Sequence, residues 1–189
     1  GLSVKWATCN LGASKPEEYG WYLMWGSVTE GGDPVCSWAN CPGNGGNSSY
    51  NSSEIAKWNS SNLANNVLNP KVDAARANWG GSWRMPTEAE FTELINNTTR
   101  TWTNVNGVVG WKCENKSDAT KYIFLPAAGY RFGTSPYGVG SYGDYWSSSL
   151  DASKPDGGRY LYFQSSLFDM YYENRCYGLA VRPVCPPQN

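Results

Sequence analysis

Short runs of alternating apolar and polar residues predict strands along most of the chain. In Arg159–Gln164 the alternation is clean, so Leu161 and Phe163 are expected to point into a core. Because successive side chains of a strand point to opposite faces, Tyr160 and Tyr162 are expected to point outward. The other predicted strands are rich in β-branched or aromatic residues or are bounded by Gly and Pro; they span 4–9, 20–26, 102–112, 121–125, 145–149 and 179–185.

Two helices are predicted before most of these strands. The first spans about 70–79, because Asn69 can cap it, Pro70 suits its first position and Gly80 can end it. The second follows the sequence Thr87-Glu88-Ala89-Glu90, which is a capping box. It places three apolar side chains on one face: Phe91, Leu94 and Ile95.

The order of elements, with helices early and strands late, favours an α+β fold. The 189 residues fit a single domain, 1–189, that is large enough to bury a core. Asn106-Gly107 is a strong signal for a tight hairpin turn. Residues 27–62 are rich in Gly, Asn, Ser and Pro, so we expect a long surface loop insertion, either functional or merely tolerated.

Composition and charge argue against several classes of function. A formal net charge of −1 does not suit nucleic-acid binding, and no stretch resembles the roughly 20 apolar residues of a membrane helix. The chain has no histidine and no Cys-x-x-Cys pair, so neither a metal site nor a cofactor is expected. The lack of histidine also removes the commonest general base, so we expect no enzymatic activity.

Tyrosine is concentrated in the last fifth of the chain, beside Ser, Gly and Asp. This is the composition of an antibody-like binding surface, since Tyr offers rigid amphipathic contact area at low entropy cost. An ordinary tyrosine-rich hairpin is the alternative. The six cysteines permit three disulfides, and Cys36 and Cys41 are close enough in sequence to close a small loop.

Five motifs occur in a fixed order and span nearly the whole chain apart from 27–62: Trp6–Ala13, Trp83–Phe91, Phe124–Arg131, Tyr145–Ser149 and Gly178–Val184. Together they resemble the Fibrobacter major paralogous domain family. More specifically, they resemble the variable proteins of diversity-generating retroelements, which occur in bacteria and their phages.

The resemblance implies a C-type lectin fold, of the variant shared with formylglycine-generating enzymes. Two helices would pack on small antiparallel sheets, and the first and last strands would pair. With that pairing, the resemblance also implies the disulfide Cys9–Cys185. In addition to this bridge and to Cys36–Cys41, it implies Cys113–Cys176.

In such proteins, template adenines are mutated during reverse transcription, which rewrites selected asparagine codons near the C-terminus. Gln, Glu, Lys, Met and Trp are never produced, so Gln164 and Glu173 do not fit. Within a display region at 145–184, the resemblance implies these ligand-binding residues: Asp151, Asp156, Gly157, Gly158, Arg159, Tyr160, Tyr162, Ser166, Leu167, Phe168, Asp169, Tyr171, Tyr172, Tyr177 and Leu179.

The function implied is adhesion or receptor binding through a hypervariable surface. The partner would be a protein or glycan on a cell surface, and the domain would be extracellular, on a bacterial surface or pilus or on a phage tail. Its oligomeric state stays open.

Three alternatives remain. A formylglycine-generating type of enzyme would need a reactive cysteine pair, for which Cys113 and Cys176 are the candidates. A calcium-dependent lectin would need a ligand triplet, but Lys154-Pro155-Asp156 has a cation where an oxygen belongs, although a structural calcium ion is compatible with the sequence. The last alternative is a structural pilus or tail module without a diversified surface.

Overall fold

The structure is a computed structural model that describes residues 2–187. Within these residues, antiparallel strands form four small sheets accompanied by three α-helices, so the predicted α+β class is confirmed. The helices are α1 (Ser52–Asn62), α2 (Ala74–Trp79) and α3 (Glu88–Asn97). The strands are β1 (Lys5–Trp6), β2 (Leu63–Ala64), β3 (Val67–Leu68), β4 (Thr98–Val105), β5 (Val108–Asn115), β6 (Asp118–Pro126), β7 (Tyr130–Phe132), β8 (Ser135–Tyr137), β9 (Tyr142–Leu150), β10 (Gly157–Gln164), β11 (Leu167–Asn174) and β12 (Val184–Cys185).

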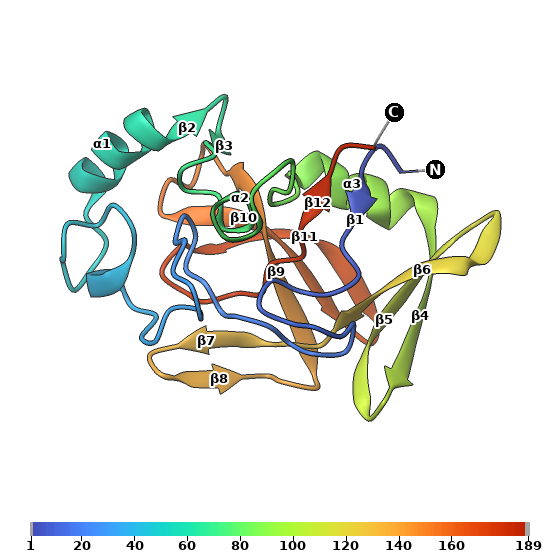
Figure 1. Ribbon diagram of the computed structural model, residues 1–189. Helices are drawn as coiled ribbons and strands as arrows, with labels where there is room; N and C mark the ends of the chain where they lie inside the picture. Colours follow the sequence, from blue (N-terminus) through green and yellow to red (C-terminus); the bar gives the residue numbers. More distant parts are fainter. Residues whose placement is uncertain (1, 188–189) are drawn as a thin grey trace.

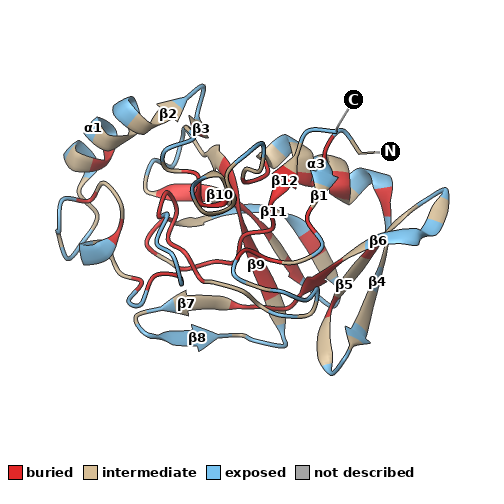
Figure 2. Cartoon of the chain, viewed as in Figure 1, coloured by how far each residue is buried: buried red, intermediate tan, exposed pale blue. Residues whose placement is uncertain are grey.

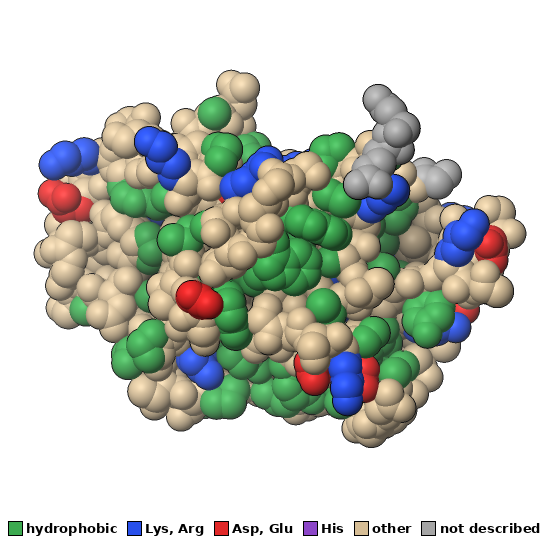
Figure 3. Space-filling model, in the orientation of Figure 1, with side chains coloured by type: hydrophobic (Ala, Val, Ile, Leu, Met, Phe, Trp, Pro, Cys, Tyr) green, Lys and Arg blue, Asp and Glu red, His purple; other side chains and the backbone are tan. Residues whose placement is uncertain are grey.

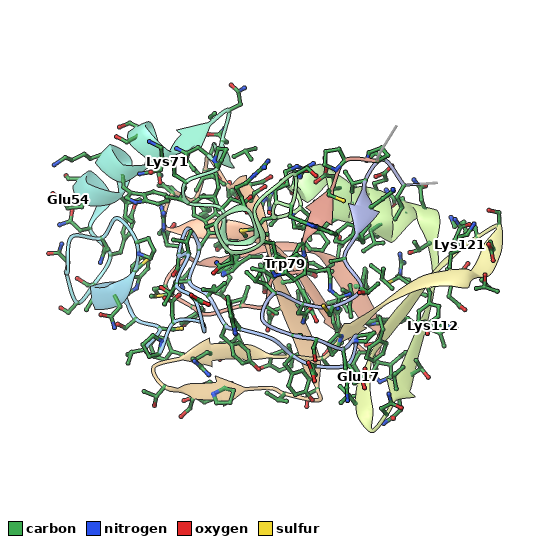
Figure 4. All side chains as sticks on the ribbon, in the orientation of Figure 1. Glu17, Glu54, Lys71, Trp79, Lys112 and Lys121 are labelled. Atoms are coloured by element: carbon green, nitrogen blue, oxygen red, sulfur yellow. The ribbon has the colours of Figure 1, made fainter. Side chains whose placement is uncertain are left out.

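The largest sheet has the strand order β11-β10-β9-β3-β2 and occupies the centre of the molecule (Figure 1). The sheet β4-β5-β6 projects to one side of it, and the β7–β8 hairpin lies along the lower edge of the view. The predicted turn Asn106-Gly107 joins β4 to β5, and both residues have the positive φ that a two-residue hairpin needs. The Asn106 side chain donates to Oε1 of Glu17 at 2.8 Å. Glu17 lies beside this hairpin in Figure 4.

The two ends of the chain lie side by side above α3 in Figure 1. Lys5 pairs with Cys185 and Trp6 with Val184, so the expected pairing of the first and last strands is confirmed. Both strands are shorter than predicted. The strand predicted at 20–26 is reduced to an isolated bridge between Leu23 and Leu179 in the described chain.

Helix α3 begins as its sequence predicts. The Thr87 hydroxyl accepts from the Glu90 amide, and the Glu90 carboxylate accepts from the Thr87 amide, which completes the capping box. Phe91 and Leu94 are buried on the inner face. The Glu90 carboxylate also pairs with Arg84, which holds the start of the helix against the preceding loop.

Helix α2 begins later than predicted. The side chain of Asp73, and not that of Asn69, accepts the amide of the first turn, from Arg76. The side-chain Oδ1 of Asn69 instead accepts from the Lys71 amide in a local turn. Asp73 also accepts from the amide of Met85. This tertiary contact holds Asp73, and not Asn69, at the start of the helix.

The prediction of a loop through 27–62 is wrong in its second half, where α1 lies. The Asn51 side chain caps this helix by accepting from the Glu54 amide, and Ile55 is fully buried under it. The preceding loop is ordered by Asn44, whose buried amide group donates to the carbonyls of Trp38, Asn47 and Ser49. Polar contacts order this segment, and its sequence lacks an apolar periodicity. The hydrophobic pattern therefore did not predict its structure.

Strands β9 and β10 separate two hydrophobic cores, visible as the buried centre of Figure 2. Leu161 and Phe163 point to the α3 side, as predicted, and pack with Phe91 and Leu94. The neighbouring residue Tyr160 points to the other side and is only 8% exposed, because Trp146, Trp25 and Leu179 form a second core there. The prediction that Tyr160 points to solvent is therefore wrong.

A buried arginine ties the two ends of the chain together. Arg182 is fully buried and donates to the Asn10 side chain and to the carbonyls of Ala7 and Phe124 at 2.8–3.1 Å. Asn10 in turn donates to the hydroxyl of Tyr145 on β9. The first segment, the last segment, β6 and β9 thus share one hydrogen-bonded centre.

All six cysteines lie in the described chain, and all are free thiols, so the structure contains none of the three predicted disulfides. Cys176 clusters with Cys36 and Cys41, whereas Cys113 lies in the core beneath α3. Because the two residues occupy different cores, Cys113–Cys176 does not fit this fold.

The predicted Cys9–Cys185 bridge fails for a different reason. The register places Cys185 opposite Lys5, four residues before Cys9. Disulfides need Cα atoms within about 7 Å, and the amide of Ala7 already bonds to Pro183, so Cys9 lies beyond the residues that face Cys185. Pairing of the terminal strands is therefore correct, but its register does not align these two cysteines.

We expect Phe163→Ala to lower the free energy of unfolding by roughly 3–5 kcal/mol, because it opens a cavity in the core beneath α3. The ring stacks on Phe168 and Tyr145 at centroid distances of 5.4 and 5.7 Å. Urea denaturation measures the change. As a control, Tyr172→Ser on exposed β11 should cost less than about 0.5 kcal/mol; equal losses in both variants would contradict the two-core arrangement.

Candidate binding pocket

The predicted binding residues do not lie on one surface, because alternate residues of β10 and β11 point to opposite faces of the central sheet. Tyr160, Tyr162 and the β11 residue Tyr171 share the face away from α3. Arg159 and Tyr172 share the opposite face.

Exposure divides the predicted residues into three groups. Ser166, Asp169, Tyr171 and Tyr172 are exposed. The partly exposed residues are Asp151, Asp156, Arg159, Tyr162, Leu167 and Tyr177. The buried residues are Gly157, Gly158, Tyr160, Phe168 and Leu179.

The buried members are part of the core, which corrects their expected display role. Phe168 stacks on Phe163 from the α3 side, and Leu179 is hydrogen-bonded through its backbone to Leu23. Gly158 lies against Trp25, and a Cβ there would sit 2.6 Å from the indole ring. Substitution at these positions would disturb packing, so they are poor sites for free variation.

Arg159 and Tyr172 are engaged on the α3 side of the sheet. Arg159 Nε lies 3.3 Å from a carboxylate oxygen of Glu88 on α3 and 3.7 Å from one of Asp151. The ammonium group of Lys154 lies 5.4 Å from the centre of the Tyr172 ring. Neither residue contributes to the tyrosine face on the other side.

On that other face, four tyrosines and two carboxylic acids surround a cavity of about 260 Å³. The lining comes from four strands and from the segment before β12: Tyr130, Tyr142, Asp144, Tyr160, Tyr162, Glu173 and Leu179. Asp144 lies opposite Tyr162 in the β9–β10 register, so both side chains point to the same face. We call this cavity the tyrosine pocket.

The rings of the tyrosine pocket support one another. Tyr142 stacks on Tyr130 at 6.2 Å and contacts Tyr162 at 5.8 Å between centroids. Tyr171 meets Tyr162 edge-on at 5.8 Å and extends the wall to the outer strand β11. Gly138, at a φ of +67°, leaves the space that the Tyr142 ring fills, so a side chain there would collide with the ring.

Asp144 is the least satisfied polar group of the tyrosine pocket. It is 4% exposed, and its Oδ2 atom has no hydrogen-bond partner among the described residues. Burial, reinforced by the nearby Glu173 carboxyl, raises the pKa of Asp144 to about 7. Burial also raises the pKa of Glu173, although the Asn174 amide donates to it.

No ion pair found in residues 2–187 includes Asp144 or Glu173. The described residues also hold no group of three or more His, Cys, Asp or Glu side chains that could bind a metal ion. Calcium takes six to eight oxygen ligands, more than two carboxyl groups provide. The tyrosine pocket is therefore an acidic, aromatic cavity whose lining includes no Lys or Arg side chain.

A larger cavity of about 770 Å³ lies between β1, α3 and the β5–β6 hairpin. It is lined partly by Trp6, Leu94 and Ile123 and by three lysines, but by no acidic residue. It shares no residue with the predicted binding set. On the face shown in Figure 3, hydrophobic side chains, which include tyrosine, lie in several areas among polar and charged ones.

Sequence reasoning found Tyr160 and Tyr162 but missed Tyr130, Tyr142 and Asp144. Asp144 carried a usable signal, since it is the one charged residue of β9 and an acid is costly to bury without a role. Tyr130 carried none, because only the fold brings β7 next to β9.

Residues 97–184 match the family model described as a domain of unknown function (DUF8237). This stretch runs from the end of α3 into β12 and contains every residue that lines the tyrosine pocket. Neither the curated proteins nor the solved structures include a match to the chain. Among residues 2–187, no helix has the length and apolar character needed to cross a membrane.

We expect Asp144→Asn to remove a pH dependence of stability. The pKa of Asp144 is about 7 in the folded chain and about 3.8 in the unfolded chain, so the folded state holds the proton more tightly. The bound proton therefore stabilises the folded state. This stabilisation is fully present below about pH 4 and is lost as the pH rises to about 7. The carboxylate should cost the folded state roughly 1–4 kcal/mol at pH 8.

Urea denaturation at pH 5 and pH 8 checks this expectation. Asp144→Asn should be the more stable protein at pH 8 and should change less between the two pH values. Asp169→Asn, an exposed position on β11, is the matched control and should follow the unmodified chain. Parallel pH profiles for all three proteins would contradict a strained carboxyl at Asp144.

Proposed function

We propose that this chain is a ligand-binding display domain, similar to the variable proteins of diversity-generating retroelements, that recognises a protein or glycan on a cell surface. The observation that carries the proposal is the continuous tyrosine wall on one face of the central sheet. The wall leads from the tyrosine pocket to exposed Tyr171 on β11.

The composition of this wall suits recognition. Tyr residues supply large contact area with few rotatable bonds, and their hydroxyls remain available for hydrogen bonds. Burial raises the pKa of Tyr142 and Tyr162, so these phenols stay protonated at neutral pH. Aromatic faces of this kind also suit stacking against sugar rings, which keeps a glycan among the candidate ligands.

The architecture supports a C-type lectin-like fold as part of the proposal. The terminal strands pair, α3 covers one face of the central antiparallel sheet, and the opposite face carries the second core and the tyrosine pocket. Display on a bacterial surface, a pilus or a phage tail is proposed from the sequence resemblance alone.

The cysteines favour binding over catalysis of the formylglycine-generating type. Cys113 and Cys176 lie in different cores, so they do not form the cysteine pair that such chemistry needs. Burial also raises the pKa of each thiol to about 12, which disfavours a nucleophilic thiolate.

A screen of the purified domain against bacterial surface glycans and proteins tests the proposal. We expect a ligand whose affinity falls at least about tenfold in the double variant Tyr162→Ser/Tyr171→Ser, because aromatic side chains commonly dominate such interfaces. Tyr172→Ser, on the opposite face, is the control and should bind normally. Equal binding by both variants, each shown to be folded, would reject the tyrosine wall as the recognition surface.

Sequences of sibling loci provide an independent test. We expect substitutions to concentrate at positions with exposed side chains, such as Ser166, Asp169 and Tyr171. Phe168 and Leu179 should stay apolar, because both fill the cores. Substitutions spread evenly over residues 1–189 would contradict diversification of this surface.

A further inference from the structure

The tyrosine pocket has an unusual charge arrangement. Two acidic side chains, Asp144 and Glu173, lie in an aromatic cavity whose lining contains no Lys or Arg. Leaving a buried carboxyl without a partner costs stability, and such a group is commonly retained for a role in binding or catalysis. The question is which group would complete the cavity.

The nearby cations of the protein are engaged elsewhere. Arg131 stacks over the Tyr22 ring at 5.0 Å and donates to the Asp33 carbonyl. Arg159 pairs with Glu88 on the far face of the sheet. The titratable groups that face Asp144 are all acids or phenols: Tyr22, Tyr130, Tyr142, Tyr160, Tyr162 and Glu173.

We propose that the tyrosine pocket receives an organic ammonium group carried by the ligand, held between the tyrosine rings and the Asp144 and Glu173 carboxylates. This proposal rests on the proposed function as a ligand-binding domain and specifies the chemistry of the bound group. A lysine side chain of a surface protein and a quaternary amine such as choline are the two sources of that chemistry.

The aromatic walls suit this group. A cation over a tyrosine face within about 6 Å of the ring centre is attracted by the ring quadrupole, and aromatic cages bind quaternary ammonium in this way. The cavity of about 260 Å³ lies just below the usual 300–1,000 Å³ of small-molecule sites. It therefore fits the head group of a ligand, while the rest of the ligand would lie along Tyr171.

The acidic floor selects the charge of the ligand. An anion would be repelled by two carboxylates, and a neutral sugar would leave Asp144 uncompensated. A cation compensates the buried carboxylate while the surrounding protein keeps water away, and under these conditions charge pairing is strong. Binding should also draw a proton from Asp144, so affinity should rise as the pH increases from 5.5 to 8.

Isothermal titration calorimetry with choline and its uncharged isostere 3,3-dimethylbutan-1-ol tests the proposal. We expect choline to bind at least tenfold more tightly than the isostere, and more tightly at pH 8 than at pH 5.5. Proton release should appear as a dependence of the measured heat on the ionisation enthalpy of the buffer. Equal affinity for the charged and uncharged probes would overturn the proposal.

Variants locate the site. Asp144→Asn keeps the side-chain shape and should weaken choline binding at least tenfold, while Asp118→Asn, an acid of β6 outside both the cavity lining and the predicted binding set, should leave it unchanged. Tyr162→Phe keeps the ring and should retain most of the affinity, whereas Tyr162→Leu should lose severalfold. Equal weakening by the two Asp variants would indicate general charge attraction and overturn a specific pocket.

A second pair of probes separates the two sources. Tighter binding of N-acetylated Gly-Lys-Gly amide than of choline, with no binding of N-acetylated Gly-Gln-Gly amide, assigns a protein lysine. The reverse order assigns a quaternary amine. Calcium binding abolished by Asp144→Asn, with no amine binding, would overturn the proposal in favour of a metal.

The outcome is distinguishable from that of the proposed function. A surface ligand that is lost in Tyr162→Ser/Tyr171→Ser but unaffected by Asp144→Asn would overturn the ammonium site and leave the display function standing. Choline binding that depends on Asp144, without any surface ligand in the screen, would support the ammonium site and count against the display function.

Discussion

The central constraint on this structure is that β9 and β10 are covered on both faces. Neighbouring residues such as Tyr160 and Leu161 enter two different cores, one beside Trp25 and the other beneath α3. A strand covered in this way has little freedom to change. Any variable surface must therefore be confined to β11, to loop residues and to the mouth of the tyrosine pocket.

Two buried charged residues show how differently the fold treats polar groups. Arg182 lies at the junction of the chain ends, and its guanidinium donates to three oxygens. Asp144, on the neighbouring part of β9, keeps an oxygen atom without a partner. Because each nitrogen of the Arg182 guanidinium has a partner, the unpartnered oxygen of Asp144 marks a place where selection for stability alone is a poor explanation.

In the proposed display domain, a fixed acidic cavity and a variable rim would have separate tasks in recognition. Interfaces commonly gain most of their affinity from a few enclosed anchor contacts, with weaker contacts around them that exclude water. The tyrosine pocket would supply the anchor, and Tyr171 with the β10–β11 turn would supply the surrounding contacts. Changing the rim would then alter the choice of ligand without rebuilding the anchor.

Features that depend on a few neighbouring residues could be predicted from the amino-acid sequence. The capping box at Thr87, the hairpin turn at Asn106-Gly107 and the inward face of Leu161 and Phe163 all arise from local backbone and alternation rules.

What covers each face of a strand, and which cysteines or acids lie close together, depends on the folded chain and could not be predicted from local sequence. The burial of Tyr160 depends on Trp25, 135 positions away in the chain, and the tyrosine pocket needs β7, β9, β10 and β11 together. Alternation along a strand predicts which side chains share a face. It does not predict whether solvent or another segment covers that face, because this depends on contacts between distant parts of the chain.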